Sequence, residues 1–266
     1  MIDIELVSEV ENKNIDRKIR RSIELFESGD ISAAIKILRS IVEKDPYNIN
    51  ALYLLARIYV ETNDLPRARE YLERILEVKP NDAETMNIMG YIYSINGDLD
   101  TAIKYFKKAT EIRPDFQPAW FNLGLAYMNI KEPEIAIEYL KQAVKLDPSD
   151  IDALNLMAVA YGILGRYDES IECARKMLEV DSNIKEAWFN MGSAYVAKKE
   201  YNKAIMCYEK ALEIDPKDAL TLYTLGRLYI RIGQREKGLQ YIRRACELGY
   251  EQACKGLGAP NFIESL

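Results

Sequence analysis

The sequence contains no histidine, the most frequent general base and a common metal ligand. Without it, the usual catalytic triads and most zinc sites cannot be built. No GxxxxGK[ST] or GxGxxG stretch offers a phosphate cradle. The many carboxylates are scattered, as is typical of solvated helices. These absences predict a protein that is not an enzyme and that has no metal site and no cofactor.

An excess of basic residues and a long apolar run are also lacking. The chain has 36 Lys and Arg against 42 Asp and Glu, a net charge of −6. Because nucleic-acid-binding proteins usually carry a basic stripe, this balance disfavours RNA or DNA as a partner. The opening MIDIELVSEVE is acidic where a signal peptide is basic. The longest apolar stretch, 153–164, is shorter than the ~20 residues of a membrane span. We therefore predict no membrane partner and a cytoplasmic location.

The four cysteines show no disulfide framework in the sequence. Cys173 and Cys207 are 34 residues apart, and Cys246 and Cys254 lack the CxxC spacing. Helices that stack one repeat apart lie ~8–10 Å from each other, whereas a disulfide requires Cα atoms within roughly 7 Å. We expect four free thiols, as is usual in a reducing compartment.

An internal repeat is the main feature that is present, and Gln117–Asp150 shows it best. Its first half places large and small side chains on one face of a helix, at Trp120, Leu123, Gly124 and Tyr127. Its second half does the same at Ala136, Leu140 and Ala143, and Pro148 ends the unit. The pattern predicts a helix–turn–helix hairpin whose two helices touch at the small residues.

The same residue types return every 34 residues in seven segments: 15–48, 49–82, 83–116, 117–150, 151–184, 185–218 and 219–252. The tyrosine recurs at Tyr59, Tyr93, Tyr127, Tyr161, Tyr195 and Tyr229. The first small position holds Ser22, Ala56, Gly90, Gly124, Ala158, Gly192 and Gly226. The second holds Ala34, Ala68, Ala102, Ala136, Ser170, Ala204 and Gly238. A single hairpin cannot bury its faces, so the copies are expected to stack.

This pattern resembles the tetratricopeptide repeat family, whose unit is a 34-residue helical hairpin. The resemblance implies an all-α, right-handed superhelical solenoid of antiparallel helix hairpins. It also implies that the first helices line a concave groove that binds a peptide or helix of a partner protein.

The ends of the chain depart from the repeat. Residues 1–14 alternate apolar and acidic residues in a way that fits a short strand or a short helix, either frayed or covering an apolar surface. The last repeat, 219–252, has six basic and three acidic residues, a net charge of +3, whereas 1–218 carry −9. Beyond the last repeat, 253–266 form a C-terminal cap and tail: a short capping helix is expected over 251–257 and an irregular tail over 258–266.

The predicted binding residues lie opposite the core stripe on the first helix of each repeat. They are Tyr53, Arg57, Asn87, Tyr91, Phe121, Asn122, Leu125, Asn155, Phe189, Asn190, Tyr223 and Arg227. Exposed rings suit an amphipathic helix or an extended peptide, and asparagine amides can pair with a peptide backbone. Phe121 and Phe189 occupy equivalent positions and are expected to contribute little to folding.

The sequence thus predicts a scaffold that binds a protein or peptide. A self-assembling protein, whose terminal segment docks on a neighbouring copy, is the alternative. The lysine, asparagine and arginine set with which some family members grip a chaperone's C-terminal carboxylate is missing. This apolar face is chemically permissive, so it does not identify the partner.

Overall fold

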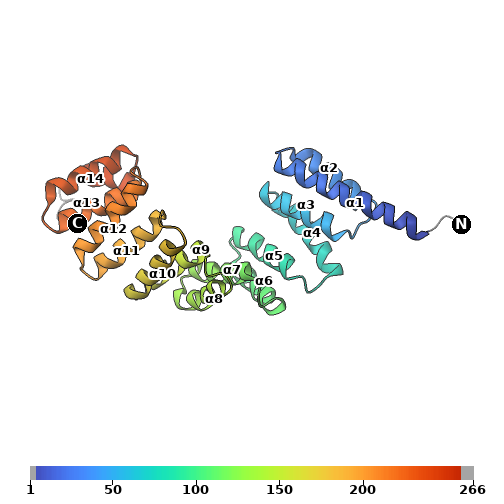
Figure 1. Ribbon diagram of the computed structural model, residues 1–266, viewed down its shortest axis with the longest axis horizontal. Coiled ribbons are helices and arrows are strands. Elements are labelled where there is room, and N and C mark those ends of the chain that lie inside the picture. Colours follow the sequence, from blue (N-terminus) through green and yellow to red (C-terminus); the bar gives the residue numbers. More distant parts are fainter. Residues whose placement is uncertain (1–3, 259–266) are drawn as a thin grey trace. The chain divides into compact units, whose positions relative to one another are not determined.

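The computed structural model describes residues 4–258, and this part of the chain is built of α-helices without any strand (Figure 1). The predicted C-terminal tail, 259–266, lies outside the described residues. The helices are α1 Ile4–Glu27, α2 Ile31–Val42, α3 Ile49–Glu61, α4 Leu65–Val78, α5 Ala83–Ile95, α6 Leu99–Ile112, α7 Gln117–Asn129, α8 Pro133–Leu146, α9 Ile151–Ile163, α10 Tyr167–Val180, α11 Lys185–Ala197, α12 Tyr201–Ile214, α13 Ala219–Arg231, α14 Arg235–Glu247 and α15 Glu251–Gly258. Odd-numbered helices from α1 to α13 are the first helices of their hairpins, and even-numbered ones from α2 to α14 are the second helices.

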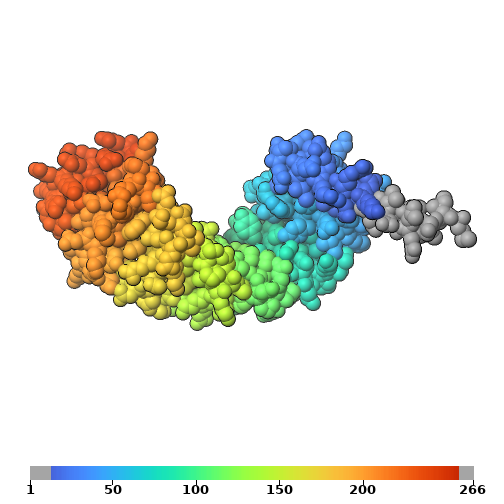
Figure 2. Space-filling view, viewed as in Figure 1, coloured from blue at the N-terminus to red at the C-terminus, as the bar shows by residue number. Residues whose placement is uncertain are grey.

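The chain forms two compact units, Met1–Asn122 and Leu123–Leu266. Within each unit, helices pack mainly on their neighbours in sequence, so successive hairpins form successive layers (Figure 2). This is the architecture of an all-α solenoid, in which each repeat buries its apolar faces against the adjacent repeats.

The turn inside each hairpin repeats with the predicted period. The turn residue of every hairpin has a positive φ, at intervals of 34: Gly29 (87°), Asn63 (60°), Gly97 (81°), Lys131 (64°), Gly165 (72°), Lys199 (61°) and Gly233 (85°). Gly249 (87°), in the turn before α15, also has a positive φ. Glycine adopts this left-handed conformation without a steric penalty and commonly ends a helix. The three other residues show that the hairpin geometry imposes the same turn even where the sequence lacks glycine.

Aspartate caps the second helix in the first three hairpins. The carboxylates of Asp30, Asp64 and Asp98 accept hydrogen bonds from backbone N–H groups three residues later. At Asp98, bonds from Thr101 lower the pKa of the carboxyl group, because they favour its charged form. These aspartates stabilise the start of each second helix.

The two helices of a hairpin approach closely at the small residues. Ala102 and Ala136 are fully buried. A Cβ atom at Gly90 would lie 2.6 Å from the Phe106 ring, and one at Gly238 would lie 2.5 Å from the carbonyl oxygen of Gly226. In the fifth repeat, Ser170 Oγ donates a 2.8 Å hydrogen bond across this contact to the carbonyl of Ala158. The predicted contact between the two small positions is present.

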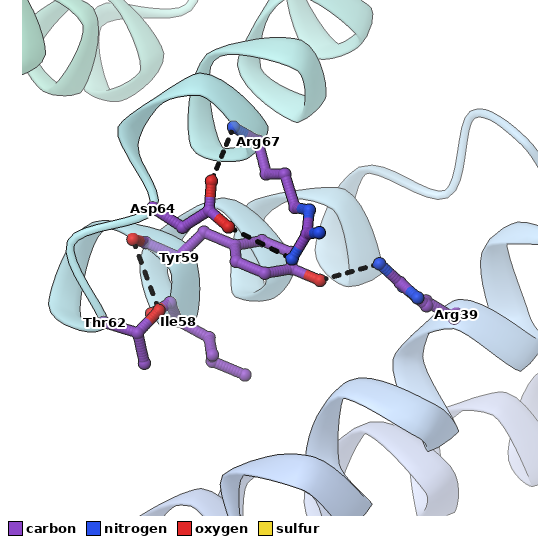
Figure 3. A network of polar contacts seen from close by, with 6 residues as sticks. All are labelled: Arg39, Ile58, Tyr59, Thr62, Asp64 and Arg67. Carbon is purple, nitrogen blue, oxygen red and sulfur yellow. Dashed lines mark hydrogen bonds and ion pairs between the residues drawn. The ribbon is translucent and has the colours of Figure 1, made fainter.

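The recurrent tyrosine ties neighbouring helices together. In four hairpins its ring stacks on a tyrosine of the second helix, with centroids 5.2–5.8 Å apart, in the pairs Tyr59–Tyr71, Tyr93–Tyr105, Tyr127–Tyr139 and Tyr229–Tyr241. The hydroxyl of Tyr59 accepts a 2.9 Å bond from Arg39 on the preceding hairpin, and the Arg67 guanidinium lies 5.6 Å from its ring (Figure 3). Tyr229 makes the equivalent link by donating to Glu209 at 2.9 Å. One ring thus joins two hairpins.

The structure shows the conformation of the N-terminal segment and of the C-terminal cap. The N-terminal segment is helical from Ile4 and continues into the first repeat as one helix, α1, which settles the choice between strand and helix. The expected capping helix is present as α15. Ala253 on α15 is fully buried beside Leu222 and Ile242, so this helix covers the last hairpin.

The expectation of four free thiols is wrong for one pair. Cys246 at the end of α14 and Cys254 on α15 form a disulfide, with Cα atoms 4.8 Å apart. The turn between the two helices brings them together, a geometry that a search for CxxC spacing does not detect. Cys173 and Cys207 are free and buried, as expected. A reducing compartment therefore has less support than the cysteine pattern suggested.

The close contact at Gly238 can be tested by substitution. Gly238→Ala places its methyl group against backbone atoms, so one helix must shift, and we expect a loss of ~1–3 kcal/mol in the free energy of unfolding. Gly162→Ala is the matched control, since its new Cβ would meet no described atom closer than Ser170 Oγ at 3.9 Å. It should be neutral or stabilising by up to ~1 kcal/mol. Urea unfolding measures both variants, and equal midpoints would refute the contact.

Candidate partner-binding face

The first-helix face consists of the twelve residues predicted above to bind a partner, together with their neighbours Ile95, Val159 and Ile163 on the same side of the first helices. Four of the twelve, Arg57, Tyr91, Leu125 and Arg227, are exposed. The other eight are half-buried, namely Tyr53, Asn87, Phe121, Asn122, Asn155, Phe189, Asn190 and Tyr223. None of the twelve belongs to the fully buried core, so every one can present at least part of its side chain to a ligand.

Exposed apolar residues recur at one position of the repeat, and within each compact unit we call them the apolar stripe. Tyr91 on α5, Leu125 on α7 and Val159 on α9 are equivalent residues, with exposed fractions of 44%, 37% and 40%. One helical turn further, Ile95 and Ile163 are exposed by 48% and 64%. Single exposed apolar residues are common, whereas within one unit Tyr91 and Ile95, and likewise Val159 and Ile163, lie one helical turn apart on the same helix.

Two pairs of asparagines bridge successive repeats. Asn122 Nδ2 donates to Asn87 Oδ1 at 2.9 Å, and Asn190 Nδ2 donates to Asn155 Oδ1 at 2.7 Å. Each pair lies within one compact unit. An amide has two donor hydrogens and an acceptor oxygen, so the bond orients both side chains and leaves donor and acceptor capacity on each pair. In the sequence, the two asparagines of each pair are 35 residues apart, one more than the repeat length, and this spacing could have pointed to the bond.

The aromatic residues of the face differ in how far they join the core. The Phe189 ring lies 5.5 Å from that of the buried Tyr208, centroid to centroid, and packs on the core of the C-terminal compact unit. This packing predicts that the Phe189 ring contributes more to folding than its position in the sequence indicated. The Tyr223 ring lies 5.1 Å from that of Tyr250, just before α15. Tyr53 is buried enough to raise the pKa of its hydroxyl, mainly through desolvation.

The two arginines of the face are in different electrostatic settings. Arg57 Nε lies 3.3 Å from Glu61 Oε1, so its charge is partly neutralised within its own helix. Arg227 forms none of the ion pairs found among the described residues, and its guanidinium lies 5.7 Å from the centre of the Tyr223 ring. Of the two, Arg227 is the better placed to meet an acidic group of a partner.

Metal-binding clusters, reactive thiols and membrane-spanning helices bear on what else the described residues could do. The described residues contain no cluster of three or more His, Cys, Asp or Glu able to hold a metal ion. Burial raises the pKa of the Cys173 and Cys207 thiols to about 11 each, which keeps both thiols protonated near neutral pH. No described helix is long and apolar enough to cross a membrane. The aromatic, amide and guanidinium groups of the face are suited to non-covalent contacts.

Phe189→Ala and Tyr91→Ala should separate packing from exposure. Removing the Phe189 ring uncovers part of Tyr208, so we expect a loss of ~1–3 kcal/mol in the free energy of unfolding, below the ~3–5 kcal/mol of a fully buried ring. Tyr91→Ala should change it by less than ~0.5 kcal/mol, because that ring is exposed. Thermal and urea unfolding report both effects. If Tyr91→Ala proved the more damaging variant, the assignment of this face would be incorrect.

Comparison with solved structures finds the same fold in proteins of known structure. A crystal structure of MamA is 28% identical, with a TM-score of 0.57, and the match covers 62% of this chain and 96% of that one. YrrB, described as a TPR protein with an unusual peptide-binding site, is 24% identical, with a TM-score of 0.62 and coverage of 70% and 96%. PilF from Pseudomonas aeruginosa is 17% identical, with a TM-score of 0.67 and coverage of 77% and 93%.

A search of curated proteins found no match to this chain. Four family models, all described as tetratricopeptide repeat, match segments from residue 25 to residue 240. The matched segments are 25–85 and 95–160 for one model, 71–104 and 207–240 for a second, 151–184 for a third and 186–218 for a fourth. With the hairpin turns and helix contacts recurring every 34 residues, these matches show that the chain belongs to the tetratricopeptide repeat family.

Proposed function

We propose that this protein is a non-enzymatic scaffold that binds an extended or helical segment of a partner protein on the first-helix face. Family membership and the fold support a role in protein interaction generally. The observation that carries the finer proposal is the pair of cross-repeat asparagine bonds, Asn87–Asn122 and Asn155–Asn190. A cytoplasmic location stays a prediction.

The asparagine bonds favour a peptide backbone as ligand because of what each pair leaves available. A peptide group presents one N–H donor and one C=O acceptor. Each asparagine pair can offer a carbonyl oxygen and an amide nitrogen, both already oriented by the bond between the two side chains. Orientation before binding reduces the conformational entropy that a ligand must overcome. The exposed apolar stripe next to each pair can hold the segment's side chains.

The apolar stripe supports an amphipathic segment rather than a purely polar one. In the C-terminal compact unit, Val159 and Ile163 lie one turn apart on α9 and are both exposed. In the N-terminal compact unit, Tyr91 and Ile95 occupy the equivalent positions on α5. Aromatic and aliphatic residues at the centre of an interface commonly contribute most of the binding free energy. Each unit therefore combines a polar clamp with an apolar contact.

Replacing all four asparagines by alanine should abolish partner capture without unfolding the protein. Both members of each pair are removed together, so neither is left buried without its bond. We expect at least tenfold lower recovery of specific partners, about 1.4 kcal/mol or more. The measurement is affinity capture from a lysate of the source cells, with quantitative mass spectrometry and circular dichroism of each variant.

The matched control is Asn81→Ala with Asn202→Ala, two exposed asparagines outside this face. Partners retained by the control and lost by the quadruple variant support the proposal. Equal recovery with wild type and the quadruple variant contradicts it. Recovery of a second copy of the chain itself would identify the alternative, self-assembly.

A further inference from the structure

The first-helix face carries a charge inversion at one position of the repeat. Arg57 and Arg227 are equivalent residues, five repeats apart. Four residues later stands Glu61 in the second repeat but Arg231 in the seventh. Residues four apart are neighbours on a helix surface, so opposite charges attract there and like charges repel. The second repeat thus neutralises its arginine at 3.3 Å, and the seventh places two positive charges together.

A small cavity opens beside the two arginines in the C-terminal compact unit. Its volume is about 150 Å³, and it lies between α11 and α13. It is lined by Val196, Thr224, Arg227, Leu228 and Arg231. Val196 and Leu228 form apolar walls, and both arginines are exposed beside them. A cavity with partly apolar walls and two guanidinium groups is suited to an anionic group carried on a side chain.

Aromatic rings hold both arginines in place. The Arg227 guanidinium carbon lies 5.7 Å from the centre of the Tyr223 ring, and that of Arg231 lies 5.6 Å from the centre of the Tyr201 ring. The two rings come from different helices, α13 and α12. A ring orients a guanidinium and attracts its charge weakly, but it does not neutralise it. The arginines therefore keep both their charge and their hydrogen-bond donors for a ligand.

The acidic residue beside Tyr201 in the chain is already paired. Glu200 precedes Tyr201, and it lies 2.5 Å from Lys203 Nζ and 3.6 Å from Lys198 Nζ. No ion pair found among the described residues includes Arg227 or Arg231. The repulsion between the two arginines is thus not relieved inside the folded chain. An external anion would relieve it and gain two charge-assisted hydrogen bonds.

We propose that Arg227 and Arg231 form an anion-binding site that receives an acidic side chain of the segment bound on the first-helix face. The proposal rests on the proposed function and adds that the partner segment is negatively charged at the end that lies on α13. The charge complementarity is specific to this end, because 1–218 carry −9 and the last repeat +3. The anionic group is a carboxylate of Asp or Glu or the phosphate of a phosphorylated residue.

Synthetic peptides test the site without knowledge of the partner. The probes are acetylated, amidated hexapeptides of glutamate, of phosphoserine alternating with glycine, and of glutamine. The measurement is titration of protein labelled with ¹⁵N-arginine, following the side-chain Nε–H signals of Arg227 and Arg231. We expect a glutamate or phosphoserine peptide to shift both signals and the glutamine peptide to shift neither. The tighter of the two anionic peptides identifies the chemical source.

Three variants make the test specific. Arg227→Gln with Arg231→Gln should weaken anionic peptide binding at least tenfold. Arg231→Glu recreates the arrangement of Arg57 and Glu61 and should abolish binding while leaving the protein at least as stable. Arg235→Gln with Arg243→Gln removes the same charge from exposed positions on α14 and should bind like wild type.

Equal weakening by the α14 control would overturn the proposal, because binding would then reflect overall charge alone. Failure of both anionic peptides to shift the two arginine signals would overturn it too. These outcomes are independent of the asparagine test. If the asparagine variant loses its partners and no anionic peptide binds, the scaffold function is supported and this anion site is not. Anionic peptides bound at Arg227 and Arg231, with every partner retained by the asparagine variant, would leave only an anion site.

Discussion

The close contact between the two helices of each hairpin is the constraint on which the rest of the structure depends. At Gly226 and Gly238 the backbones approach until no room is left for a side-chain methyl group. Elsewhere, as at Gly90, a large residue of the second helix fills the space beside the glycine. Interiors packed in this way tolerate little change in volume. The contact fixes which side of each first helix is buried and leaves the opposite side half-buried or exposed.

The binding chemistry follows from that division. Because the core stripe uses small and aromatic residues, exposed positions on the remaining side of the first helices can vary with little effect on the fold, whereas Phe189 packs on Tyr208. There the chain places asparagine pairs, exposed aliphatic residues and, in the last repeat, two arginines. The recurrent tyrosines also join successive hairpins, as the bond from Arg39 on α2 to Tyr59 on α3 shows. A repeat array thereby turns separate helices into a surface with defined spacing.

Much of the fold could be predicted from residue periodicity, since Gly29, Gly97 and their equivalents mark the turns and Ala102 and Ala136 mark the helix contacts. The contacts between repeats could not. Asn87 and Asn122 are 35 residues apart, so a search at the repeat length passes over them. The packing of Phe189 depends on Tyr208. The equivalent residue two repeats earlier is Leu140, so the repeat pattern alone does not predict this aromatic contact. The disulfide depends on a turn between two helices that no cysteine spacing rule describes.

Site-specific photo-crosslinking tests the central claim, that the first-helix face binds the partner, most directly. The crosslinker benzoylphenylalanine would replace Tyr91 or Val159 on the first helices, where the native side chains are 44% and 40% exposed. As controls it would replace Val78 or Met206 on second helices, which are 46% and 53% exposed. Irradiation in the source cells should give partner adducts from Tyr91 and Val159 and none from Val78 and Met206. Adducts formed only from Val78 or Met206 would show that the partner binds the opposite side and would contradict the account.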